Sequence, residues 1–166
     1  KKVIEEDLVN DLVKSTILPQ KTIDYFILNK FDNENLFWHN LSLYQQLSHD
    51  FIKRYGDKLN WDDITMYQSL TLDFLIENAT YIVWKKLPLN LAGNQLINDN
   101  TLMLFKDYNI WENIGCFSNV TTDCIFNNLT YFTDFKNSVL SLVKYRTLNS
   151  TQIYILTQIY EDEEVW

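Results

Sequence analysis

A short tandem repeat constrains the fold of this sequence more than any other feature. Trp38, Trp61 and Trp84 are 23 residues apart, and the residues after the first two agree position by position. The matching groups are Leu41–Ser42 with Ile64–Thr65, Tyr44–Gln45 with Tyr67–Gln68, Leu47–Ser48 with Leu70–Thr71, and Asp50–Phe51–Ile52 with Asp73–Phe74–Leu75. Trp111 and, more weakly, Val139 continue the frame. We therefore expect repeats starting near 38, 61, 84, 111 and 139, with insertions that lengthen the later units to 27–28 residues.

Each recurring offset has a defined role in a pair of short helices. Ser48 is a predicted N-cap, Asp50 would lie at the positive end of the helix dipole, and Leu47 with Ile52 would form a hydrophobic staple. The other units offer an apolar residue, a cap and a second apolar residue at the same offsets: Leu70, Thr71 and Leu75; Ile97, Asn98 and Leu102; Val120, Thr121 and Ile125; Leu148, Asn149 and Ile153.

Helical spacing also governs the residues around these caps. Residues 61–68 precede a cap and form a predicted first helix, and Gly56 is expected in a left-handed position in the turn before the next unit. Apolar residues recur at spacings of three and four, and no segment of comparable quality alternates with period two. The fold class predicted is all-α, with tandem helix-turn-helix repeats of 23–28 residues stacked into a short solenoid or compact bundle.

The whole chain, 1–166, is expected to form a single helical-repeat domain because no Ser-rich or Pro-rich linker divides it. Residues 1–37 would hold an N-terminal cap helix and a degraded repeat, and 38–166 the repeats. The cap helix is predicted to place five apolar residues on one face: Ile4, Leu8, Val9, Leu12 and Val13. Loops are expected at Asp32–Asn35, Ala92–Asn94 and Glu161–Glu164. A start at Lys1 and an end at Trp166 suggest a piece of a longer chain.

Charge and composition narrow the classes of partner. The chain carries 14 basic and 22 acidic residues, a net charge of −8, and therefore lacks the basic footprint that nucleic acids and anionic membranes require. No apolar run approaches the roughly 18 residues of a transmembrane helix. Aromatic residues make up 15% of the sequence and supply ample surface for a core. Other proteins are the expected partners, with no nucleic acid and no membrane.

Residues with chemistry-bearing side chains do not form a recognisable catalytic or metal pattern. His39 and His49 are followed by Asp50, Asp62 and Asp63, yet neither histidine recurs at its repeat offset, so a solvated surface is expected for both. We therefore predict no catalytic, cofactor-binding or metal residue and no cofactor. An enzyme remains an alternative only if His39, His49, Asp50 and Asp62 converge in one pocket.

The cysteines, tryptophans and glutamines are given structural interpretations. Cys116 and Cys124 lack a CxxC spacing, and Cys124 stands at a Phe position of the repeat, where a small buried hydrophobe fits. The repeated Trp residues are predicted to fill the core and not to stack on nucleic-acid bases. Gln45 and Gln68 are predicted to bond to backbone at the turn between helices.

The tandem pattern supports a resemblance to a family. Trp-x-x-Ile/Leu-Ser/Thr-x-x-Gln-x-Leu-Ser/Thr-x-x-Phe-Ile/Leu, best at Trp38–Ile52 and Trp61–Leu75, resembles a short repeat in uncharacterised proteins of giant, nucleocytoplasmic large DNA viruses and some phages. The pattern departs from the family where Cys124 and Gln152 replace Phe and Val139 replaces Trp. The resemblance brings no known catalytic residues, and it implies a viral origin with a structural or host-interaction role.

These observations favour a non-catalytic helical-repeat scaffold that mediates protein–protein interaction, as a virion or capsid-associated structural protein. The expected location is the virion or the host cytoplasm. The alternative is an F-box-like or other host-directed adaptor, which needs an exposed apolar helix face such as 3–13. A loop over Leu87–Asn98 is predicted to contact the partner of the scaffold.

Overall fold

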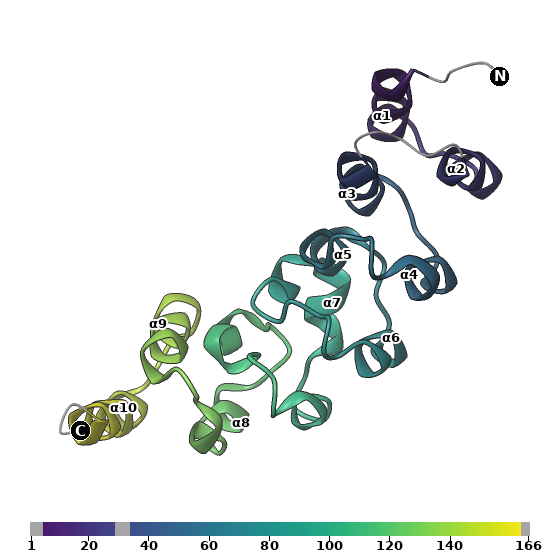
Figure 1. The fold of residues 1–166 in the computed structure, drawn as a ribbon. Helices are drawn as coiled ribbons and strands as arrows, with labels where there is room; N and C mark the ends of the chain where they lie inside the picture. The colour runs from purple at the N-terminus through teal and green to yellow at the C-terminus, as the bar shows by residue number, and fades with distance from the viewer. Residues whose placement is uncertain (1–4, 29–33, 164–166) are drawn as a thin grey trace.

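The protein is all-helical in the computed structural model, which describes residues 5–28 and 34–163 (Figure 1). Its α-helices are α1 (Glu6–Ser15), α2 (Gln20–Ile27), α3 (Glu34–Tyr44), α4 (His49–Tyr55), α5 (Trp61–Tyr67), α6 (Leu72–Glu77), α7 (Leu91–Leu96), α8 (Thr122–Phe126), α9 (Phe135–Tyr145) and α10 (Ser150–Glu163). Its 3-10 helices are η1 (Leu87–Leu89), η2 (Leu102–Phe105), η3 (Trp111–Cys116) and η4 (Leu129–Tyr131). Within the described ranges, strand-like pairing is limited to one isolated bridge, between Asn98 and Asn119.

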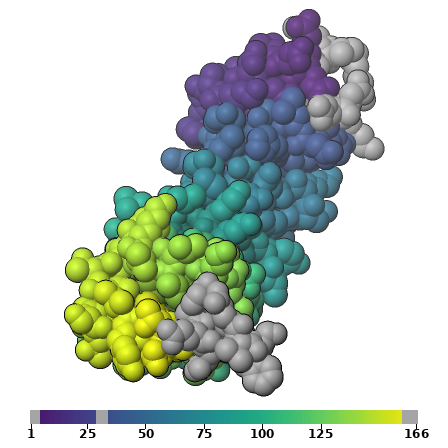
Figure 2. Space-filling view, turned by 90° about the vertical axis from the view of Figure 1, so that its left-hand side faces the viewer, coloured from purple at the N-terminus to yellow at the C-terminus, as the bar shows by residue number. Residues whose placement is uncertain are grey.

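The helices follow one another in two rows along an elongated molecule, with the termini at opposite ends (Figures 1 and 2). One row contains α1, α3, α5, α7 and α9, and the other contains α2, α4, α6, α8 and α10. Successive members of the first row touch: α1 packs on α3, α3 on α5, α5 on η1, and η3 on α9. The Nδ2 of Asn40 on α3 donates to Oδ1 of the buried Asn10 on α1 at 2.8 Å. The helices of the first row therefore pack on one another from α1 to η1, and again from η3 to α9.

The predicted caps begin the second helices of the pairs. The Ser48 hydroxyl accepts from the Phe51 N–H (3.2 Å), the Thr71 hydroxyl from Phe74 (3.2 Å) and the Thr121 hydroxyl from Cys124 (3.1 Å). These bonds satisfy amides that a helix N-terminus leaves free, which confirms the prediction. At the fourth cap, Asn98 accepts from the N–H of Thr101, but a 3-10 helix follows. Asn149 also caps, yet Ile153, the predicted staple partner of Leu148, is exposed.

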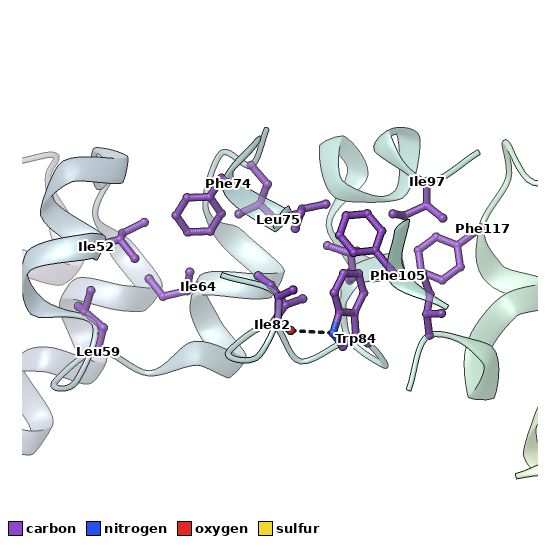
Figure 3. Close-up of a cluster of buried hydrophobic side chains, with 14 of the residues drawn as sticks. Ile52, Leu59, Ile64, Phe74, Leu75, Ile82, Trp84, Ile97, Phe105 and Phe117 are labelled. Atoms are coloured by element: carbon purple, nitrogen blue, oxygen red, sulfur yellow. Dashed lines mark hydrogen bonds between the residues drawn. The ribbon is translucent and has the colours of Figure 1, made fainter. Parts of the chain in front are cut away.

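A continuous apolar core runs between the two rows (Figure 3). Trp38, Trp84 and Trp111 are buried in it, as predicted, and Trp61 is half-buried. Three indole N–H groups donate to the carbonyl five residues earlier: Trp61 to Gly56, Trp84 to Ala79 and Trp111 to Lys106, at 2.8–3.0 Å. Each Trp ring also contacts a later tyrosine, with centroids 5.0–5.4 Å apart: Tyr55, Tyr81, Tyr108 and Tyr131. The loops before three tryptophans are thereby fixed to the core.

Three expectations about turns are wrong. Gly56 has a right-handed conformation (φ −59°), and its role is close approach: an added Cβ would lie 3.3 Å from the Trp61 ring. Ala92–Asn94 belongs to α7, because the Asn90 side chain accepts from the Gly93 N–H and starts a helix there. Consequently Leu87–Asn98 is not a loop. Residues 161–163 continue α10 and do not form a loop; Glu164 lies outside the described residues.

Two expected boundaries of helix pairs also differ from those in the structure. The pair expected to start at Val139 begins earlier, because the Asp134 side chain accepts from the Asn137 N–H and caps α9 at Phe135. The described residues up to 28 contain the helix pair α1–α2, and α3 begins at Glu34, so Glu34 and Asn35, expected in a loop, are helical. On α1, Val9 and Val13 are buried as predicted, whereas Leu8 and Leu12 are exposed; Ile4, Asp32 and Asn33 lie outside the described residues.

Candidate protein-interaction surface

Buried glutamine amides join successive helix pairs. Gln45, at the end of the first helix of its pair, donates from Nε2 to the carbonyls of Val13 and Thr16 and accepts at Oε1 from the Leu18 N–H. Gln68 does the same one pair later, with the carbonyls of Ser42 and Gln45 and the N–H of Leu47. These bonds confirm that both glutamines bind backbone at the turns.

Asn90 occupies the corresponding place in the next pair. Its Nδ2 donates to the carbonyls of Thr65 (3.0 Å) and Gln68 (2.8 Å), which have the same spacing along the chain as the carbonyls that Gln68 binds. We call Gln45, Gln68 and Asn90 the amide clamp. Because each clamp residue bonds to the first helix of the preceding pair, the ends of successive first helices are held in fixed register.

The residue before each clamp residue points to solvent. Tyr44, Tyr67 and Leu89 are 43%, 55% and 68% exposed, whereas the adjoining clamp residues are buried. We call these three residues the edge row. Since the clamp bonds adjacent helix ends to one another, the edge row lies along one side of the array. Exposed large side chains in a regular row are a recognised feature of protein-binding surfaces.

The row has a counterpart near the C-terminal end. Tyr145 is exposed and precedes Arg146, whose Nε donates to the carbonyl of Gly115 (2.9 Å) and whose guanidinium also bonds to the carbonyl of Phe117. Burial lowers the pKa of Arg146, against the opposing effects of Cys116 and Asp99. An arginine thus makes backbone bonds like those of the amides in the other pairs.

The structure does not bring the predicted catalytic candidates together as one group. His39 Nδ1 lies 2.8 Å from the buried Oδ2 of Asp63, and Asp62 pairs with Lys86 at 2.6 Å. His49 Nε2 lies 2.9 Å from the carbonyl oxygen of Ser69, and the His49 ring contacts Phe74. Over the described ranges, no group of three or more His, Cys, Asp or Glu side chains is arranged to hold a metal ion.

The two cysteines are free thiols and both are half-buried. Burial raises the pKa of the Cys124 thiol, and the charge of Asp99 and a hydrogen bond to it add to the effect. A raised pKa keeps the thiol protonated and weakly nucleophilic at neutral pH. Cys124 contacts the core at its edge, so its position is less buried than the sequence predicted.

A polar hollow of about 550 Å³ opens between the loops that precede Trp84 and Trp111. Lys85, Asp107 and Glu112 lie on its wall with Tyr81 and Tyr108. The charged groups of the wall include both signs, and Asp107 and Glu112 have no third metal-ligating partner among the described residues. The hollow is therefore a weaker candidate for a binding surface than the edge row.

Comparisons of the chain with models of known families, with curated proteins and with solved structures find no match. Among the residues that the structure describes, no helix has the length and apolar character to cross a membrane.

Sequence reasoning missed the edge row. The recurrence of Tyr44–Gln45 at Tyr67–Gln68 is visible in the sequence, but it does not show which residue of each pair is exposed. The useful signal was that the two residues are adjacent. Successive residues of a helix are rotated by about 100° around its axis, so the residue before a buried glutamine points in a different direction. The Leu89–Asn90 pair was not recognised as a third example because Asn replaces Gln there and a 3-10 helix precedes Asn90.

Proposed function

We propose that this chain is a non-catalytic scaffold of stacked tandem helical repeats that binds another protein along the edge row. The single observation that carries the proposal is the alternation of an exposed large residue and a buried clamp amide in three successive pairs. The clamp supports the repeat arrangement, because equivalent amides bond to equivalent carbonyls along the stack. In a solenoid of this kind each repeat contacts only its neighbours.

The edge row is suited to a protein partner. Tyr44 and Tyr67 each offer a large apolar ring and a hydroxyl at a low cost in conformational entropy, which is why tyrosine is enriched at interfaces. The clamp fixes the backbone next to each ring, so little ordering is required on binding. The net charge of −8 favours a partner surface that is neutral or basic around its apolar contact.

The setting that we propose is viral. The repeat resembles those of giant-virus proteins, and a rigid scaffold fits a virion or capsid-associated structural role, in the virion or the host cytoplasm. The alternative, a host-directed adaptor such as an F-box-like protein, has one supporting observation: Leu8 and Leu12 on α1 are exposed. An adaptor would bind cellular machinery through that helix, whereas the scaffold binds through the edge row.

The test is chemical crosslinking and mass spectrometry of the tagged chain in infected host cells. The edge-row variant Tyr44→Ser, Tyr67→Ser, Leu89→Ser should lose a partner that the unaltered chain retains in fixed ratio. Capsid or other virion proteins as that partner would support the structural role. Cellular ubiquitin-ligase components that depend on Leu8 and Leu12 would support the adaptor instead.

A control removes exposed apolar surface elsewhere on the molecule. Ile76→Ser with Met103→Ser alters exposed residues on α6 and η2, in the second helices of their pairs. Circular dichroism must show that both variants remain folded. If the control loses the partner and the edge-row variant keeps it, binding does not occur along the edge row and the proposal is wrong.

A further inference from the structure

We propose that copies of this chain associate head to tail, with the outer face of α9 in one copy packed against the outer face of α1 in the next. The partner is therefore a second copy of the same chain. This inference concerns the two ends of the array and does not depend on the edge row.

The two helices lie at opposite ends of the first row (Figures 1 and 2). On α1, Asn10 faces α3, since it bonds to Asn40. On α9, Ser141 faces η3: its hydroxyl accepts from the Gly115 N–H at 2.9 Å, and a Cβ at Gly115 would lie 2.3 Å from the Ser141 carbonyl oxygen. The opposite side of each helix faces away from the neighbour that it contacts in the row.

The α1 end face consists of Asp7, Leu8, Asp11 and Leu12. These residues recur at spacings of three and four and lie opposite the buried Val9, Asn10 and Val13. Leu8 is 55% exposed, and Leu12 is exposed beside it. The end face therefore combines two carboxylates with two leucines.

The α9 end face consists of Lys136, Leu140, Val143 and Lys144, which have the same helical spacing. Leu140 is 56% and Val143 62% exposed, and both lysines are exposed. Lys144 Nζ lies 4.9 Å from the ring centroid of the neighbouring Tyr145. Two cations thus flank two aliphatic side chains, in an arrangement that is complementary to the α1 end face.

Charge complementarity distinguishes a second copy from other occupants. Helix α9 has two lysines and no acidic residue, although the chain as a whole has a net charge of −8. Helix α1 carries three acidic residues, Glu6, Asp7 and Asp11, against Lys14 alone. The basic helix of the molecule therefore lies at one end and an acidic helix at the other, which steers unlike ends together and keeps like ends apart.

Apolar exposure at both ends supplies the remaining attraction. Here the second-row helices extend the apolar surface, with Leu28 next to α2 and Ile153 and Tyr154 on α10 exposed. The proposed contact joins unlike faces, so it is heterologous and leads to open linear assembly, not to a closed two-fold dimer.

Sedimentation velocity of the 166-residue chain over a wide concentration range tests the proposal. The expected result is a weight-average mass that rises above that of the monomer with concentration and falls with added salt. Asp7→Lys with Asp11→Lys, or Lys136→Glu with Lys144→Glu, should each leave the chain monomeric where the unaltered chain is at least dimeric. Combining all four changes in one chain should restore association, because the end charges are then exchanged.

A charge-matched control makes the outcome specific. Lys53→Glu with Arg54→Glu alters two exposed cations on α4 and should leave association unchanged. A monomer at every concentration would overturn the proposal. So would association that only the α9 reversal abolishes, which indicates a two-fold contact through α9, or association that the combined variant fails to restore. Loss of partner capture by the edge-row variant with self-association intact would separate this inference from the proposed function.

Discussion

Gln68 Nε2 donates a hydrogen bond to the backbone carbonyl of Gln45 at 2.8 Å, so one clamp residue binds the main chain of the clamp residue before it. Asn90 Nδ2 in turn donates to the carbonyl of Gln68, again at 2.8 Å. Successive pairs are thereby linked by a chain of buried amide bonds, and each clamp side chain holds its own pair to the one before it.

Gln68→Ala should therefore destabilise the protein well beyond the loss of a surface residue. The change leaves the Ser42 and Gln45 carbonyls and the Leu47 N–H without this partner, and Gln68 itself is buried. We expect the free energy of unfolding to fall by about 3 kcal/mol, because each buried polar group left unpaired costs on the order of 1–3 kcal/mol. Urea unfolding followed by far-UV circular dichroism measures the change.

Gln46→Ala is the matched control, since Gln46 is one residue from the clamp and exposed. Its effect should be within about 0.5 kcal/mol of zero. Equal losses for the two variants would mean that the amide bonds contribute nothing specific.

The first two repeats were predictable from the sequence because identical chemistry recurs there. Ser48 and Thr71 stand at the same offset and cap their helices as predicted. The next unit was predicted less well. Glycine is a residue type common in turns, yet Gly93 is a packing residue: an added Cβ would lie 2.5 Å from the Leu87 side chain. The local propensity of glycine cannot distinguish a turn from a packing position, because the space around Gly93 is defined by a neighbouring element.

The candidate surface depended on tertiary contacts that no single position reveals. Tyr67 is exposed because Gln68 turns inward to carbonyls 23 and 26 residues away. The sequence identifies the recurring pair but does not specify which member is buried. The head-to-tail complementarity likewise needed the structure, which shows that Val143 is exposed and Ser141 faces η3, while Leu140 borders a hollow that Glu112 of η3 also lines.

Gly115→Ala should separate α9 from η3. The new Cβ would lie 2.3 Å from the carbonyl oxygen and 2.6 Å from the carbonyl carbon of Ser141, both backbone atoms that cannot rotate away. We expect the free energy of unfolding to fall by about 3 kcal/mol or more, which is at or above the usual cost of overpacking. Thermal unfolding by calorimetry should show a lower transition temperature, or a separate early transition for the C-terminal helices.

Gly56→Ala is the comparison, because Gly56 has a right-handed conformation and its nearest neighbours lie at 3.0 Å or more. Its loss should be clearly smaller than that of Gly115→Ala. The opposite order would contradict the close packing of α9 on η3.

Asp99 should make stability depend on acid pH. Burial raises the pKa of its carboxyl, but hydrogen bonds from the Thr121 N–H and hydroxyl (2.7 Å each), a bond from Cys124 and the charge of Arg146 outweigh it, so the pKa is lowered. A carboxyl with a lowered folded pKa stabilises the fold above its unfolded pKa of about 3.9. That contribution is lost as the pH falls from this value through the lower folded pKa.

Asp99→Asn should consequently be less stable than the unaltered chain at pH 7, and the difference should shrink as the pH falls below about 3.9. The effect is modest because Asp99 is exposed to solvent. Urea unfolding at a series of pH values measures it, with Asp57→Asn in an exposed turn as the charge-matched control. A difference that stays constant with pH would assign the loss to geometry and not to ionisation.

Trp111 and Trp61 offer a test of what burial contributes at one repeated position. Both indoles donate to the carbonyl five residues earlier, but Trp111 is fully buried and Trp61 is half-buried. Trp111→Ala should cost about 3–5 kcal/mol, as expected for truncation of a large core side chain, and Trp61→Ala should cost less. Because the hydrogen bond is lost in both variants, the difference between their free energies of unfolding measures the buried ring. Equal losses of unfolding free energy would show that the repeated tryptophan stabilises the fold through its N–H bond and not through the packing of its ring.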